Sequence, residues 1–210
     1  VRAIDLAGFT RVEDPAQADV ILLNGVIPAA SELAERVKAG TGLVLILGEQ
    51  TAAVDVETVL GFSVALEQNE EPASLVEIKI SDALATEILW NSAPQVRERY
   101  STLTPLSSVQ PLVVTYESGD WVLWQARPGV FVVNAVLEND ATNPQIQQWA
   151  YYNYLVYHLV SRAAGQTPMS FADYPGSPVP HAAERNVLWL VLGLLLITTI
   201  GVFTWVRRYS

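Results

Sequence analysis

One uncharged apolar run near the C-terminus constrains what this chain can fold into more than any other feature. Residues 187–206, VLWLVLGLLLITTIGVFTWV, contain 20 consecutive residues without an ionisable side chain, and Arg207 and Arg208 follow directly. At ~1.5 Å rise per residue, a helix of this length spans about 30 Å, the thickness of a bilayer's hydrocarbon core. Trp189 and Trp205 lie near its two ends, where indole rings favour the headgroup level. The run predicts a C-terminal transmembrane helix, since a buried core helix would show a polar stripe.

The basic residues that flank this run predict its orientation. Arg207 and Arg208 follow it, whereas Arg185 before it is offset by Glu184. Because cytoplasmic flanks carry the excess of Lys and Arg, we expect residues 207–210 to be cytoplasmic and the N-terminal domain to lie outside the cell. The expected localisation is the cell membrane, as a single-pass protein. Export of the domain needs an upstream signal, so we expect the sequence to be the C-terminal part of a longer polypeptide.

Composition predicts a domain and a stalk in the rest of the chain, and it excludes several partners and reactions. Residues 1–165 are long enough for one domain, and residues 166–186, which hold four prolines, predict a semi-extended stalk. The part before the apolar run contains all 22 acidic residues and 10 of the 12 basic ones, a formal charge of −12. This charge argues against nucleic acid as a partner. The absence of cysteine excludes disulfides, thiolate metal sites and a cysteine nucleophile.

The first half of the domain has the pattern of a strand, a helix and a second strand. Residues 19–25 and 42–48 are continuous apolar runs, as expected of strands covered on both faces. Between them Pro28 suits a first helical turn, and apolar residues then recur at helical spacing up to Val37. A short helix is expected over residues 54–60. The fold class predicted from this order is α/β.

The second half predicts mainly strands and one long helix. The expected strands are residues 62–66, 75–80, 111–116, 121–126 and 130–136. The last three are joined by two turn-forming segments, residues 117–120 and 127–129. Asn143 and Pro144 supply a cap and a first-turn residue for a helix that we expect to end near Ala164.

The order of these segments resembles a known family. The stretches that carry the resemblance are ADVILL at residues 18–23, AGTGLVLILG at residues 39–48, residues 83–94, and GVFVVN at residues 129–134. They are similar to the class I glutamine amidotransferase-like domain of bacterial membrane proteins of the aerotolerance-regulator (Bat-type) or gliding and ABC-auxiliary kind. The resemblance covers residues 8–210. It implies a flavodoxin-like domain with a mostly parallel sheet, followed by one transmembrane helix.

The resemblance also implies a first candidate site. Active amidotransferases place a nucleophilic cysteine in the turn after a central strand, which here falls near Gly48, Glu49, Gln50 and Thr51. None of these is a cysteine, and the two histidines, His158 and His181, lie in the last helix and the stalk. Covalent catalysis needs a nucleophile and a base within hydrogen-bond reach. We therefore expect a degenerate corner, either a relic or the lining of a pocket, in which Gly48 adopts a positive φ.

A second candidate site is an oxygen-rich loop between the last strand and the last helix. Glu138, Asp140 and Asn143 lie where α/β folds bind ligands, at the carboxyl end of a strand. The loop lacks the spacing of a calcium site, and Asn143 also suits a helix cap. A capping role and a ligand loop both remain open. We expect no metal and no cofactor.

Three functions fit these observations. The first is a non-catalytic, membrane-anchored, extracytoplasmic interaction or assembly protein, a pseudoenzyme whose partners are the lipid bilayer and a protein or other domains of the same polypeptide. Aromatic residues at positions 149, 151, 152, 154 and 157 cover more than one helical face, which favours such a contact. The second is a solute-binding or ABC-transporter auxiliary subunit. The third is an exported hydrolase that uses carboxylates such as Glu49 and Asp140.

Overall fold

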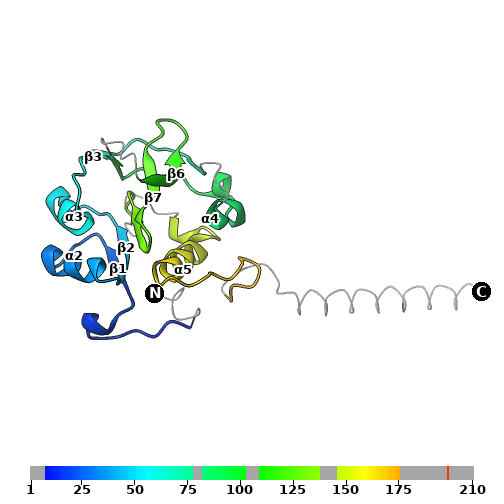
Figure 1. Cartoon of the computed structure of the whole chain (residues 1–210). Helices are drawn as coiled ribbons and strands as arrows, with labels where there is room; N and C mark the ends of the chain where they lie inside the picture. The colour runs from blue at the N-terminus through cyan, green and yellow to red at the C-terminus, as the bar shows by residue number, and fades with distance from the viewer. Residues whose placement is uncertain (1–7, 78–81, 103–108, 138–145, 176–197, 199–210) are drawn as a thin grey trace, which may run out of the picture.

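The domain consists of a central sheet with helices on both faces (Figure 1). The computed structural model describes residues 8–77, 82–102, 109–137, 146–175 and 198. Within these residues the helices are η1 (Pro15–Gln17), α2 (Ala30–Lys38), α3 (Ala53–Leu60), α4 (Ala83–Glu87), η2 (Trp90–Ser92), η3 (Ile146–Gln148) and α5 (Tyr152–Ala163). The strands are β1 (Val20–Asn24), β2 (Gly42–Ile46), β3 (Leu66–Asn69), β4 (Leu75–Glu77), β5 (Arg99–Thr102), β6 (Gln110–Thr115), β7 (Trp121–Arg127) and β8 (Val130–Val133).

The six-stranded sheet is mixed, which corrects the predicted fold class. Its order is β1-β2-β8-β7-β6-β4. The pairs β1–β2 and β2–β8 are parallel, whereas β8–β7, β7–β6 and β6–β4 are antiparallel. The prediction of a mostly parallel, flavodoxin-like sheet was therefore wrong. The tight turns between β6, β7 and β8 are the physical reason, because strands joined by a few residues can pair only in the antiparallel sense.

Strand β2 explains how the two faces of the sheet are covered. All five of its residues are buried, so its side chains pack alternately on opposite faces. Leu43 and Leu45 share one hydrophobic cluster with α2 and α3. Val44 and Ile46 share the other with α4 and α5. Figure 1 shows α2 and α3 on one side of the sheet and α4 and α5 on the other.

The chain after α5 folds back onto the domain. Tyr174 has no exposed surface, and its ring stacks on Tyr157 at 5.0 Å between centroids. The backbone N–H of Met169 donates to the hydroxyl of Tyr157 at 2.8 Å, and that of Phe171 donates to Glu87 at 2.7 Å. Residues 166–175 of the predicted stalk thus pack against α4 and α5, and they cover much of the aromatic surface of α5.

The predicted membrane anchor requires a correction as well. In the part of the chain that the structure describes, no helix is both long and apolar enough to cross a bilayer. Apart from Thr198, the predicted span of residues 187–206 lies outside the described residues, and so does the tail, residues 207–210. The predicted interface residues Trp189, Trp205, Arg207 and Arg208 therefore also lie outside them. The predicted localisation, a single-pass membrane protein with an extracytoplasmic domain, depended on that span and is not retained.

Two further elements differ from the sequence prediction. A strand was predicted at residues 62–66, but β3 covers Leu66–Asn69 and shares only Leu66 with that prediction. It pairs with the unpredicted β5 in a separate two-stranded sheet. The last helix begins at Tyr152, not Pro144, and the short η3 precedes it. The helical spacing of the sequence places Ala150 and Asn153 on the inner face of the predicted helix, but both residues are exposed.

A candidate binding site at the strand ends

The predicted corner at Gly48, Glu49 and Gln50 lies where the parallel strands end. β1, β2 and β8 run in the same direction, so their carboxyl ends share one edge of the sheet. A hollow of about 360 Å³ opens there, and its lining residues are Asn24, Gly25, Val26, Gly48, Glu49, Gln50 and Val136. Ligands of open α/β sheets bind at this edge. The structure therefore brings the three predicted residues together with the ends of β1 and β8.

A close backbone contact shapes the corner. A Cβ atom added to Gly48 would lie 2.6 Å from the Cα atom of Gly25, closer than any side-chain atom can approach. Gly25 adopts a φ of +75°, whereas Gly48 has a negative φ. The expectation of a positive φ at Gly48 was therefore wrong. Glycine is needed at position 48 because two loops cross in contact, not because the turn is left-handed.

Thr51 and Tyr100, to which the sequence analysis assigned no role, hold this crossing in place. The hydroxyl of Thr51 accepts a hydrogen bond from Gly48 N–H at 2.9 Å and donates to the carbonyl oxygen of Gly25 at 3.1 Å. The hydroxyl of Tyr100 donates to the carbonyl oxygen of Gly48 at 2.8 Å. Hydrogen bonds of Thr51 on one side and of Tyr100 on the other thus hold the backbone of the corner. Side chains at positions 49 and 50 project from a fixed turn and are exposed.

Strand β5 places Tyr100 at the corner. The N–H of Tyr100 donates to Asn134 O at 2.7 Å, and the N–H of Val136 donates to Glu98 O at 3.1 Å, so β5 continues the ladder beyond the end of β8. Burial raises the pKa of Tyr100, and the negative charges of Glu98 and Glu49 raise it further. The tyrosine therefore stays a neutral hydrogen-bond donor at physiological pH. No local sequence pattern predicts β5, because the segment is polar. Its partner strand β3 is equally polar and lies some 30 residues earlier in the chain.

Among the described residues, the corner does not bring a nucleophile together with a histidine base. His158 lies in α5, is 1% exposed and packs in the cluster on the other face of the sheet. Burial and the positive charge of Arg162 lower its pKa to about 4, so it is neutral. Within the described ranges, no three His, Cys, Asp or Glu side chains are grouped to hold a metal ion. The second predicted site, Glu138, Asp140 and Asn143, lies outside the described residues.

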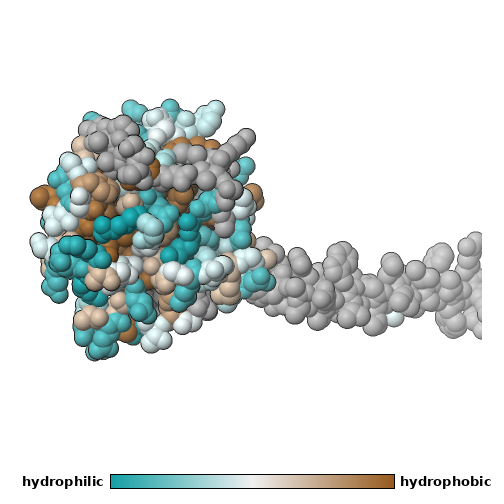
Figure 2. All heavy atoms as spheres, in the orientation of Figure 1, coloured by the Kyte–Doolittle hydropathy of each residue, from teal (hydrophilic) through white to brown (hydrophobic). Residues whose placement is uncertain are grey.

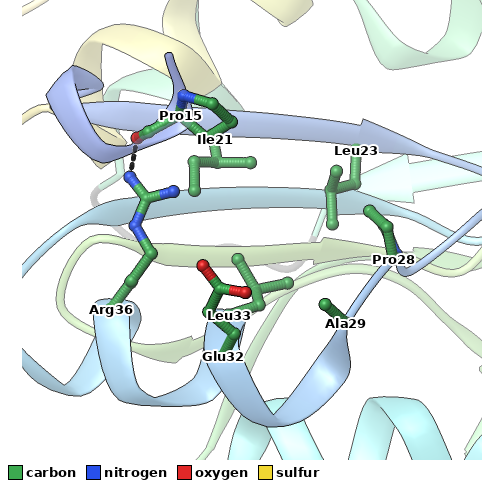
Figure 3. Close-up of a pocket in the computed structure, with 8 residues that line it drawn as sticks. All are labelled: Pro15, Ile21, Leu23, Pro28, Ala29, Glu32, Leu33 and Arg36. Carbon is green, nitrogen blue, oxygen red and sulfur yellow. Dashed lines mark hydrogen bonds between the residues drawn. The ribbon is translucent and has the colours of Figure 1, made fainter.

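Other hollows on the domain have different linings. An apolar groove of about 250 Å³ lies between β1 and α2, with Ile21, Leu23 and Leu33 in its wall. Figure 3 shows Arg36 reaching from α2 across the end of this groove, where it donates to the carbonyl oxygen of Pro15. On the face seen in Figure 2, polar residues cover most of the described surface, and apolar residues form small patches between them. The strand-end hollow differs from this groove in that two amide side chains, Asn24 and Gln50, line it.

Comparison with known proteins supports the fold and leaves the activity open. No family model matches the chain, and no curated protein matches its sequence. A solved structure, the cytoplasmic protein STM1381 from Salmonella typhimurium LT2, is similar with a TM-score of 0.52 and 17% sequence identity, over 68% of this chain and 70% of that one. A second, SMU.1228c, has a TM-score of 0.45 and 10% identity, over 75% of this chain and 86% of that one. The first likeness concerns the fold alone.

Proposed function

We propose that this domain is a non-catalytic binding module that holds a protein partner at the strand-end hollow. The observation that carries the proposal is the chemistry of the corner. It sits where an amidotransferase-like domain would keep its nucleophile, yet Thr51 and Tyr100 use their hydroxyls to brace the backbone. What remains directed at solvent is a carboxylate, Glu49, and an amide, Gln50. Such groups recognise a ligand but supply no nucleophile and base pair.

Rigidity favours recognition over chemistry at this site. The corner is fixed by the glycine crossing and by three side-chain hydrogen bonds, so Glu49 and Gln50 leave the domain from a pre-organised turn. A rigid presentation reduces the conformational entropy that binding costs. The sequence resembles amidotransferase-like domains but lacks their cysteine, which supports the same proposal. Solute binding remains the second candidate, because a hollow of about 360 Å³ has the volume of small-molecule sites.

Blocking the hollow tests the proposal. Val26 lines it and is 46% exposed, so Val26→Trp fills the opening without entering the core. We expect the wild-type chain to retain a specific partner on an affinity column, and Val26→Trp to lose that partner with an unchanged melting temperature. Val54→Trp is the matched control, because Val54 is 63% exposed and does not line the hollow. Equal retention by both variants would contradict the proposal, and so would glutaminase or esterase turnover that Glu49→Ala abolishes.

A further inference from the structure

We infer that β1 binds an extended segment of a partner protein as an added strand, along its outer edge and over the apolar groove beside α2. The described residues that line this groove differ from those of the strand-end hollow, so the inference goes beyond the proposed function. β1 is the first strand in the order of the six-stranded sheet, and among the described strands it pairs with β2 alone. The free side of such a strand is a template for pairing with another chain.

The register of β1 shows which backbone groups are directed to this edge. Asp19 and Gly25, which flank β1, each make a backbone hydrogen bond of 2.9 Å to β2 or its first residue, through the carbonyl oxygen of Asp19 and the N–H of Gly25. In a parallel pair, bonds to one neighbour recur at every second residue. The N–H and C=O groups of Val20 and Leu22 therefore point away from β2. Among the described residues, none bonds to them on that side.

β1 also lacks the features with which edge strands avoid pairing. Its sequence, VILLN, has no charged residue and no proline, and its register with β2 is continuous, without a bulge. Residues 20–23 are partly exposed. Natural sheets block such edges with charges, prolines, bulges or a covering segment. We therefore expect this regular, apolar edge to be covered in the functional state.

The groove beside α2 gives the added strand a place for its side chains. Figure 3 shows Ile21 and Leu23 on β1 and Leu33 on α2 in the wall of the groove. A strand added to β1 continues the sheet, so every second side chain lies on this face, over a groove of about 250 Å³. Main-chain hydrogen bonds then supply affinity, and the groove selects apolar side chains.

Charge favours a partner's segment over a second copy of this chain. Each copy carries a net charge of −10, so two copies repel each other. Exposed carboxylates lie beside the edge, Asp19 before β1 and Glu32 on the groove wall. Arg36, which also lines the groove, already donates to the carbonyl oxygen of Pro15. The segment that fits is extended, with apolar residues at alternate positions and lysine or arginine near its ends.

Hydrogen exchange of the full chain, read by NMR, tests the inference with a designed peptide. The probe is acetylated and amidated KTLTLTK, and KLLTTTK is the control with the same composition and charge but no alternation. In the free chain, the amides of Val20 and Leu22 should exchange faster than those of Ile21 and Leu23, which bond to β2. KTLTLTK should slow the exchange of Val20 and Leu22 in a saturable way, whereas KLLTTTK should not.

Methylation of the peptide nitrogens tests the backbone pairing itself. A strand paired with β1 directs every second N–H to β1 and the others to solvent. Of two peptides, methylated either at the threonines or at the leucines, one should therefore bind about tenfold more weakly than KTLTLTK and the other should bind like it. Weakening by methylated threonine indicates antiparallel pairing, and weakening by methylated leucine indicates parallel pairing.

Two variants of α2 test the groove. Glu32 lines it, whereas Glu35 is an exposed residue of the same helix outside the described lining. Glu32→Trp should weaken binding of KTLTLTK about tenfold, and Glu35→Trp should keep the wild-type affinity at the same melting temperature. Val26→Trp, which blocks the strand-end hollow, should also bind KTLTLTK like the wild type. Loss of that binding would show one surface in place of two and would contradict the inference.

The remaining outcomes overturn the inference. They are the absence of saturable slowing by KTLTLTK, equal binding of KTLTLTK and KLLTTTK, equal binding of both methylated peptides and KTLTLTK, and equal weakening by Glu32→Trp and Glu35→Trp. Amides of Val20 and Leu22 that exchange as slowly as those of Ile21 and Leu23 in the free chain would show that the edge is already occupied. Protection of Val20 and Leu22 that rises with protein concentration would assign the edge to a second copy.

Discussion

Gly25 and Gly48 cross so closely that a Cβ atom on Gly48 would lie 2.6 Å from the Cα atom of Gly25. At these two positions the loop after β1 and the loop after β2 contact each other through backbone atoms. Thr51 then bonds to both glycines, and the corner that presents Glu49 and Gln50 becomes a fixed part of the sheet edge. The geometry of the hollow depends on this contact, and the first two predictions address it.

Gly48→Ala should destabilise the domain, because the added methyl group meets backbone that cannot rotate away. Overpacking of this kind costs about 1–3 kcal/mol. Urea denaturation at neutral pH measures the change in the free energy of unfolding. Gln50→Ala serves as the control, since an exposed side chain two residues away should change stability by about 0.5 kcal/mol or less. Equal stability of the two variants would show that the loops can separate.

Thr51→Val should cost about 1–3 kcal/mol, because it leaves Gly48 N–H without the acceptor and Gly25 C=O without the donor that Thr51 supplies. Valine has nearly the same shape as threonine, so the loss is attributable to the hydroxyl. Thr51→Ser keeps the hydroxyl and should lie close to the wild type. Chemical denaturation of the wild type and the two variants measures their free energies of unfolding. If Thr51→Val is as stable as Thr51→Ser, the hydrogen bonds of the Thr51 hydroxyl do not stabilise the corner.

His158 should make stability depend on pH below neutrality. Its folded pKa is about 4, mainly because of burial, and Arg162 lowers it while Asp82 and Glu87 raise it. An unfolded histidine has a pKa of about 6.5. The unfolded state therefore binds an extra proton between these values, and the free energy of unfolding falls as pH falls through that window, by on the order of 3 kcal/mol.

The comparison that isolates this effect is wild type against His158→Gln. Both proteins share every titrating carboxylate, so the difference between their unfolding free energies at pH 7 and pH 4.5 reports His158. We expect the wild type to lose more stability than the variant over this range. Parallel pH dependences would mean that the histidine is protonated in the folded state.

Asp82 should have two separable roles. It pairs with Arg162 at 2.8 Å, and its carboxylate also accepts the N–H of Leu84 at 2.9 Å as the cap of α4. Asp82→Asn keeps a capping oxygen and loses the charge, whereas Asp82→Ala loses both. A lost cap costs about 1 kcal/mol. In thermal or urea unfolding, stability should therefore decrease from the wild type to Asp82→Asn and further to Asp82→Ala. If Asp82→Ala is no less stable than Asp82→Asn, the capping role is excluded.

The elements that the sequence predicted are those with strong local patterns. β1, α2, β2 and α3 follow from two apolar runs around an amphipathic segment, and β6, β7 and β8 follow from apolar runs joined by tight turns. The direction of pairing was missed because a buried strand has the same composition in parallel and antiparallel sheets. The turns after Tyr116 and Arg127 already implied antiparallel pairs, so this information was present in the sequence.

The candidate site was predicted only in part. Glu49 and Gln50 were singled out because the resemblance to amidotransferase-like domains places a nucleophile turn after the second buried strand. Thr51 and Tyr100 were missed for different reasons. The hydrogen bonds of Thr51 reach across to another loop, and Tyr100 arrives from a polar strand whose partner is distant in sequence. The need for glycine at position 48 was predicted with the wrong cause, because contact between distant loops leaves no local signal.

Site-specific photocrosslinking tests most directly whether the strand-end hollow is the surface that binds a partner. A photoreactive benzoylphenylalanine replaces Gln50, which lines the hollow, and in a matched variant replaces Gln166, an exposed glutamine in the cleft at the opposite edge of the sheet. We predict a discrete crosslinked protein species from position 50 that is absent from position 166 and is lost when Val26→Trp is added. The same adducts from both positions, or no adduct from position 50, would contradict the account.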